Sequence, residues 1–236
     1  MKPYEKVPPA DPRAVHSVQH LCSKIKTLYP SYVTDFEKRY GAWQTTWYAG
    51  INLFSSVPDL TGPPEFQDLA KLGPKSLPLV VEKLTQPDDF FATTLYNKIE
   101  KNSKFKVDPN NTLDYCILQR HANLVVDMNY DRYSDVEEAL RQFKASMQQK
   151  YYNLDTNLTD CADDDAYKRL TELGEGAIAH IMMEWKTNSN EQVNRIWEIL
   201  INDIVHGRRP GDLESGLGRW EDWNDWFENK DYDDAP

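Results

Sequence analysis

The sequence predicts an all-α protein built from repeated helical units, and the main observation is a segment that occurs twice. Residues 66–100 and 167–201 match without a gap at an offset of 101 positions. Apolar residues recur at helical spacing in both copies, and no alternating run typical of a β-strand exceeds about five positions. Self-similarity of this kind predicts one supersecondary unit, helix–turn–helix–loop–helix, used twice. Apolar positions that recur in both copies and are expected in the core are Leu72, Val80, Leu84, Leu95, Leu173, Ile181, Trp185 and Ile196.

The helices ahead of the first copy have clear start and stop signals. Asp11 precedes Pro12, which is the combination of an N-cap and a proline at the first helical position. Pro30 ends this helix, and Ser31 is the expected cap of a second one. We therefore expect an N-terminal pair of helices, the second of which carries Trp47 on its apolar side.

Turn residues divide the repeated unit into its helices. Gly73 and Gly174 each follow a short apolar helix, where a glycine with positive φ commonly ends the helix. Pro74 is suited to the start of the next helix, and Asp88 is expected to cap the third.

Between the copies the pattern again favours helices. Residues 112–128 are expected to be helical, with a strand at 124–128 as the alternative. A capping box at residues 134–137 predicts a new helix that runs to about Tyr152. Near the end of the chain, four aromatic residues at spacings of three and four predict a helix docked on the core: Trp220, Trp223, Trp226 and Phe227.

The whole chain is expected to form a single all-α domain. Its segments are N-terminal helices (1–64), a first repeat unit (65–101), intervening helices (102–160), a second repeat unit (161–206), and an aromatic helix with an acidic tail (207–236).

Composition argues against several functional classes. The net charge of −11 repels phosphate, so a DNA partner is not expected. No apolar run approaches the roughly 18 residues of a membrane span, and the first residues lack the apolar core of a secretion signal, which predicts a cytoplasmic protein without a membrane partner. Three scattered cysteines favour neither a disulfide framework nor a zinc site. His16 and His20 supply only half of a zinc site, so no metal or cofactor is predicted.

The pattern Leu-x-x-Leu-Gly-x-x-x-Leu-Pro-x-Val-Val-x-x-Leu at residues 69–84 resembles a HEAT-type or armadillo-type helical repeat. Together with the stretch at 90–97 and the histidine- and tryptophan-containing end at 206–236, it is similar to a set of small fungal proteins, most of which have no assigned function. This resemblance covers residues 66–101 and 167–236. It implies a HEAT-like array and says little about chemistry.

The chain also lacks the familiar motifs of nucleotide-binding proteins, hydrolases and metalloenzymes. In this respect it is similar to the arginine-containing cyclodipeptide synthases of fungal secondary metabolism. That resemblance implies a transferase that uses aminoacyl-tRNA to join an arginyl residue to a second amino acid. It rests on no shared motif, so it assigns no catalytic residue.

Candidate catalytic residues were sought among polar side chains within or at the end of apolar helices. Asp203 and His206 stand three positions apart, and a carboxylate beside an imidazole suits a general base. Glu184 interrupts an apolar run, where a buried carboxylate needs a cation, either the guanidinium of a substrate or an internal lysine or arginine. The candidate substrate-binding residues are Arg120, His121, Trp47, Trp197 and Arg208.

A second function fits the same residues. The chain is then a non-catalytic HEAT-like interaction module that binds a basic peptide or protein along its concave face. His206 would in that case stabilise a helix C-terminus. Both hypotheses place the functional surface in a groove shared by the two repeat units.

Overall fold

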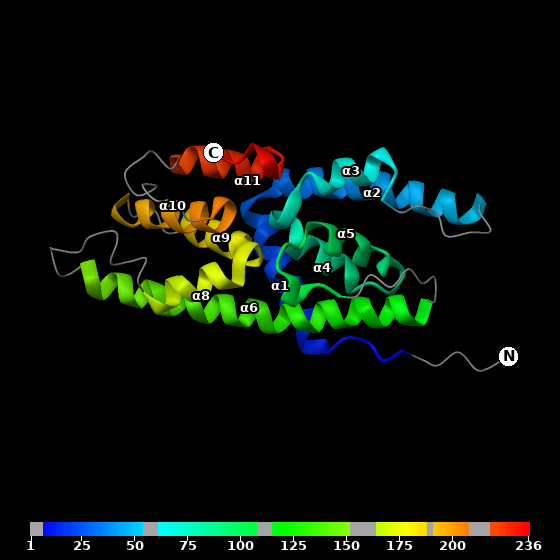
Figure 1. Cartoon of the computed structure of the whole chain (residues 1–236), viewed down its shortest axis with the longest axis horizontal. Coiled ribbons are helices and arrows are strands. Elements are labelled where there is room, and N and C mark those ends of the chain that lie inside the picture. Colours follow the sequence, from blue (N-terminus) through cyan, green and yellow to red (C-terminus); the bar gives the residue numbers. More distant parts are fainter. Residues whose placement is uncertain (1–6, 54–60, 108–114, 152–163, 188–190, 208–217) are drawn as a thin grey trace. The chain divides into compact units, whose positions relative to one another are not determined.

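A computed structural model describes residues 7–53, 61–107, 115–151, 164–187, 191–207 and 218–236 (Figure 1). The described residues form helices and turns and contain no strand, which confirms the all-α prediction. The strand considered for residues 124–128 is wrong, because these residues lie inside a long helix. Within these ranges, no helix has both the length and the apolar character needed to cross a membrane.

The chain forms two compact units, Met1–Tyr130 and Asp131–Pro236, and each is described by itself. Unit 1 contains α1 (Pro12–Leu28), α2 (Pro30–Leu53), α3 (Pro64–Ala70), η1 (Gly73–Ser76), α4 (Leu77–Leu84), η2 (Pro87–Asp89), α5 (Ala92–Ile99), η3 (Ser103–Phe105) and the first part of α6 (Tyr115–Tyr151). Unit 2 contains the rest of α6, α8 (Asp165–Leu173), η4 (Gly174–Ala177), α9 (Ile178–Thr187), α10 (Glu191–His206), α11 (Trp220–Asn229) and η5 (Tyr232–Asp234).

The start of α1 follows its sequence signals. The Asp11 side chain accepts a hydrogen bond from the backbone N–H of Arg13, and Pro12 is the first helical residue. The helix ends at Leu28 with Tyr29 as its C-cap, and Pro30 begins α2. The cap predicted at Ser31 is wrong, because Ser31 already lies inside the helix. The fixed φ of proline suits the first helical position, so Pro30 itself begins α2.

The core of unit 1 is aromatic and centres on Phe91. Its ring is stacked on Trp47 at 5.0 Å between centroids and meets Trp43 edge-on at 5.1 Å. Both tryptophans come from α2, which packs on α3, while α4 packs on α1 and α5. The side chains of α2 thus close one side of the repeated unit.

Unit 2 has a comparable centre at Phe143 of α6. Its ring lies 5.5 Å from Trp197 of α10 and 5.8 Å from Tyr167 of α8, measured between centroids. The aromatic helix at the end of the chain is confirmed as α11, which packs on α10 and buries three of its four predicted residues, Trp223, Trp226 and Phe227.

The two copies share one order of elements. The series α3, η1, α4, α5 in unit 1 corresponds to α8, η4, α9, α10 in unit 2, and η1 and η4 begin at Gly73 and Gly174. The φ angles of these glycines are 63° and 64°, so both have the predicted positive φ. The eight predicted core residues are all buried. The cap predicted at Asp88 is wrong, because this residue lies in η2 and α5 begins after Phe91 without a side-chain cap.

Helix α6 is uninterrupted over 37 residues (Figure 1). The capping box at residues 134–137 therefore does not begin a helix, and this prediction was wrong. The physical reason is that residues 115–151 contain neither proline nor glycine, so nothing stops the preceding helix before it reaches Ser134. Ser134 is exposed on the surface of α6.

The burial pattern reveals a longer correspondence than the sequence match. Buried positions of the first helices recur on α6 at an offset of 100, although the residue types differ and the match is not apparent in the sequence. The buried residues Tyr29, Tyr32, Val33, Phe36, Tyr40, Trp43 and Trp47 correspond to Asn129, Arg132, Tyr133, Val136, Leu140, Phe143 and Met147.

Candidate functional site

A cleft of about 510 Å³ lies within unit 1, between α1, α2 and α4. Helices α1 and α4 pack on each other, and α2 starts after the break at Tyr29, so three helices bring side chains to the same place. Apolar side chains of Val33 and Leu79 form part of the lining. The charged side chains in the lining are Lys26, Glu37, Glu82, Lys83 and Asp89.

The carboxylates of the cleft outnumber its lysines by three to two. Lys83 is the internal counter-ion: its Nζ lies 2.7 Å from Oε2 of Glu37 and 4.9 Å from the centre of the Tyr40 ring. Because two ammonium groups share the lining with three carboxylates, the cleft keeps an excess of negative charge whenever all its groups are ionised.

Glu82 is a half-buried carboxylate of the cleft. Within the part of the chain that the structure describes, it makes no ion pair at 4.0 Å or closer. Burial raises the pKa of the Glu82 carboxyl above its ordinary value, and the Glu37 carboxylate raises it further, while Lys83 and Lys26 act in the opposite direction. The ionised form of Glu82 would therefore gain from an additional cation.

Asp89 is a second carboxylate of the lining whose pKa is raised. Its side chain is 9% exposed and accepts a hydrogen bond of 2.8 Å from Nε2 of Gln44. Burial raises the pKa of Asp89, and this effect exceeds the opposing influence of Lys83, the Tyr40 hydroxyl and Gln44. The carboxylate is held in a fixed direction but is only partly neutralised.

Cys22 lies on the inner side of the cleft and is a structural residue. Its Sγ donates a hydrogen bond of 3.3 Å to the carbonyl of Pro78, which joins α1 to α4. Burial raises the pKa of the thiol well above its ordinary value, so the reactive thiolate is disfavoured. The lining of the cleft thus combines charged and polar side chains with a few apolar ones.

The predicted catalytic pair lies in unit 2, and the structure gives its members separate partners. Oδ2 of Asp203 accepts a hydrogen bond of 2.6 Å from the hydroxyl of Tyr167. His206 is exposed at the end of α10, and its Nε2 lies 3.0 Å from the carbonyl oxygen of Pro236. The polar partner of the imidazole is thus a backbone carbonyl rather than the Asp203 carboxylate.

Glu184 forms an ion pair with a lysine of the protein itself. Oε1 of Glu184 lies 2.6 Å from Nζ of Lys144, which links α9 to α6 in unit 2. This is the internal lysine that was considered as an alternative to a substrate guanidinium. An arrangement of this kind stabilises the packing of two helices and leaves less charge for a ligand.

The remaining predicted binding residues are dispersed. Trp47 and Trp197 are buried, packed against Phe91 and Phe143 respectively, and so belong to the two cores. Arg120 is exposed and His121 partly exposed on α6, both in unit 1. Arg208 lies outside the described residues.

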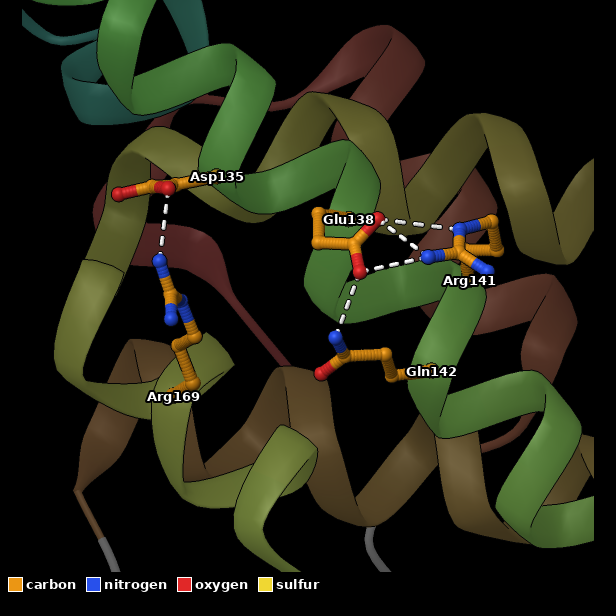
Figure 2. A network of polar contacts seen from close by, with 5 residues as sticks. All are labelled: Asp135, Glu138, Arg141, Gln142 and Arg169. Atoms are coloured by element: carbon orange, nitrogen blue, oxygen red, sulfur yellow. Dashed lines mark hydrogen bonds and ion pairs between the residues drawn. The ribbon is translucent and has the colours of Figure 1, made fainter.

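A polar network on unit 2 shows how acidic side chains behave when arginines neutralise them (Figure 2). Glu138 accepts hydrogen bonds from Arg141 and Gln142, and Asp135 pairs with Arg169 at 2.7 Å. Hydrogen bonds from Arg141 hold the pKa of Glu138 below its ordinary value. Exposed pairs of this kind contribute little to stability, because water and salt screen the charges. We assign this network to the surface of the fold, in contrast to the cleft, where pKa values are raised.

Sequence reasoning missed the cleft. One signal was available: Glu82 stands where the second copy has Met183, so a charged residue replaces an apolar one at the same repeat position. The sequence alone does not show that α1 lies against this position, because Cys22 and Pro78 are 56 residues apart.

No candidate metal centre emerges from the described ranges, where no cluster of three histidine, cysteine, aspartate or glutamate side chains is arranged to hold a metal ion. His16 and His20 are both exposed on α1. Comparisons with protein-family models, curated proteins and solved structures found no match for this chain.

Proposed function

We propose that this protein is a HEAT-like helical-repeat module without catalytic activity, and that the cleft of unit 1 binds a basic segment of a partner protein. The observation that carries the proposal is the cleft itself, in which Glu37, Glu82 and Asp89 face only two lysines. A lysine or arginine side chain of a partner would supply the cation that Glu82 lacks.

The shape of the cleft suits such a side chain. The methylene stem of lysine or arginine can pack on Val33 and Leu79 while its charged end reaches Glu82. A guanidinium offers several donors and is weakly hydrated, which favours arginine over lysine beside a half-buried carboxylate. The net charge of −11 would guide a basic partner towards the protein.

The repeated order of elements supports the HEAT-like part of the proposal. Helix pairs that recur at a fixed offset, with the same turn glycines and the same buried register, are typical of helical-repeat proteins. Proteins of this architecture present extended surfaces for other proteins.

The test compares two variants of equal net charge. Glu82→Gln with Asp89→Asn removes two carboxylates from the cleft, and Asp135→Asn with Glu138→Gln removes two from the network of unit 2. A fluorescein-labelled peptide with two arginines and two lysines among alanines is titrated by fluorescence polarisation at about 0.15 M salt. We expect the cleft variant to bind roughly tenfold more weakly than the parent, and the network variant to stay within about twofold.

Equal losses in the two variants would show that the peptide responds to overall charge, and the cleft would lose its assignment. The tRNA-dependent cyclodipeptide synthase stays a prediction. Mass spectrometry of a heterologous host that expresses the chain tests it, because arginine-containing diketopiperazines that require the intact gene, and that vanish with His206→Ala, would replace the module by an enzyme.

A further inference from the structure

The segment that precedes α1 lies along the first half of α6 and is held there through its backbone (Figure 1). Nδ2 of Asn123 donates a hydrogen bond of 2.6 Å to the carbonyl of Pro8. The backbone N–H of Asp11 donates one of 3.0 Å to Oδ1 of Asp127. Nε2 of Gln119 donates one of 3.1 Å to Oδ1 of Asn123, which directs the Asn123 amide N–H groups towards the segment.

The three side chains Gln119, Asn123 and Asp127 form a polar strip, because residues four positions apart share one face of a helix. The strip supplies a donor for a carbonyl and an acceptor for an N–H. Both contacts involve backbone groups of the bound segment, so they place no demand on its side chains.

The bound segment, residues 7–11, buries little of itself. Pro8 and Pro9 are exposed, and Ala10 is its buried residue. Prolines favour the extended conformation and lack an N–H, so the carbonyl groups are the natural sites of recognition. With two hydrogen bonds and one small buried side chain, the segment is weakly held and can be exchanged.

An apolar side chain beside the strip is partly open to solvent. Leu124 is 48% exposed and is one of two large hydrophobic residues exposed in the described ranges. It stands three positions before Asp127, so it lies beside the strip on the helix surface. A bound chain with an apolar residue at this level would cover the exposed part of Leu124.

We propose that the polar strip of α6 is a binding surface for an extended, proline-containing segment of a partner protein, and that residues 7–11 occupy it intramolecularly. The partner segment carries an apolar residue that covers Leu124. A second copy of this chain is the weaker occupant, since its own segment offers no new contact while the tethered one has the higher effective concentration. The strip lies on α6 and the cleft on α1, α2 and α4, so this proposal stands independently of the proposed function.

The experiment uses the full chain and two fluorescein-labelled peptides, one with the sequence of residues 5–13 and one with a leucine added at each end. Pro8→Gly with Pro9→Gly loosens the tethered segment and leaves the strip intact. We expect this variant to bind both peptides at least fivefold more tightly than the parent in fluorescence polarisation, and to bind the leucine-containing peptide more tightly than the other.

Two further changes are made in the loosened variant. Asn123→Asp removes the N–H donor with little change of size and should weaken binding about fivefold or more. Gln142→Glu makes the same amide-to-acid change on the exposed surface of α6 in unit 2 and should leave binding unchanged. Leu124→Ser should remove the advantage of the leucine-containing peptide, and it keeps the test valid if Asn123→Asp does not fold, as judged by circular dichroism.

The proposal is overturned if the loosened variant binds no better than the parent, if Asn123→Asp and Gln142→Glu behave alike, or if Leu124→Ser has no effect on the leucine-containing peptide. Loss of the basic peptide from the cleft variants described above would leave this result unaffected, because the two tests change different helices.

Discussion

The two units bury a basic side chain at corresponding places but supply it from opposite elements. In unit 1, Lys75 of η1 is 1% exposed and its Nζ lies 5.2 Å from the centre of the Tyr32 ring on α2. In unit 2, the residue at the position of Tyr32 is Arg132, also 1% exposed, and the residue at the position of Lys75 is Gly176. The buried basic side chain thus comes from the turn in unit 1 and from the long helix in unit 2.

Gly176 shows why the residue at the turn and the residue on the long helix must change together. A Cβ atom at this position would lie 2.1 Å from Cζ of Arg132, so the turn of unit 2 has no room for a side chain. Nη2 of Arg132 donates a hydrogen bond of 2.6 Å to the carbonyl of Leu173, the residue before the turn glycine. The comparison teaches that the repeat keeps its register and one buried basic side chain, while the element that supplies this side chain changes.

A second difference explains why the cleft belongs to unit 1. Three positions of its lining, Val33, Leu79 and Glu82, correspond to Tyr133, His180 and Met183 in unit 2. Those three residues are buried, and the rings of Tyr133 and His180 lie 5.2 Å apart. At these positions unit 2 thus has two buried rings and a methionine where unit 1 has two aliphatic side chains and a carboxylate beside the cleft.

The largest expected effect compares equivalent core leucines. Leu72→Ala and Leu173→Ala should each cost about 2–5 kcal/mol of unfolding free energy, because each removes a buried isobutyl group and leaves a cavity. Leu72 is 1% exposed and Leu173 is 9%, so the first change should cost more. Urea denaturation followed by circular dichroism gives both values, and a loss below about 1 kcal/mol at either site would remove that leucine from the core.

The break between α1 and α2 has no counterpart in α6, and a proline tests this difference. Tyr130 occupies the position of Pro30 at the offset of 100. Tyr130→Pro should cost about 3 kcal/mol or more, since it removes a helical hydrogen bond and clashes with the preceding turn. Pro30→Ala is the control and should change the melting temperature little, because a helix already starts there. Equal small effects would mean that α6 tolerates the same break.

The exchanged pair can be rebuilt in unit 2. Gly176→Lys alone should cost about 1–3 kcal/mol, because its side chain collides with Arg132. Adding Arg132→Tyr recreates the combination of unit 1 and should recover at least half of the loss. A double-mutant cycle from thermal or urea unfolding measures the coupling, and strictly additive costs would show that the two positions are not equivalent to Tyr32 and Lys75.

The smallest effect concerns the pH dependence of the two kinds of carboxylate. Because the pKa of Glu82 is raised in the folded protein, its contribution to stability is present below the ordinary pKa and is lost as the pH rises through the raised pKa. Glu82→Gln is neutral at every pH, so it should match the parent in acid and exceed its unfolding free energy by roughly 0.5 kcal/mol or less at neutral pH, since water screens a half-buried carboxylate.

Glu138→Gln should change stability in the opposite sense. The pKa of Glu138 is lowered by Arg141, so its contribution is present above the ordinary pKa and is lost in acid. Unfolding curves between acid and neutral pH compare the two variants with the parent. If both variants shift stability in the same direction at neutral pH, the contrast between cleft and surface network is wrong.

Much of the helical framework could be predicted from local sequence signals. Asp11 with Pro12, the stop at Pro30, the turn glycines and the spacing of aromatic residues near the C-terminus all act within a few residues of one another. Such signals fail where several compete: the capping box at Ser134 was a valid local pattern, but a helix already under way has no reason to restart.

The sequence by itself determined that the described chain is helical, that a unit recurs at an offset of 101, and which apolar residues are buried, because burial follows helical periodicity. Only the tertiary structure brought Cys22 and Lys26 of α1 to Glu82 of α4, and Pro8 to Asn123 of α6. These contacts join residues far apart in the chain, and their geometry depends on how whole helices pack. Charge and spacing along the sequence carry no record of that packing, so the sites became visible only in three dimensions.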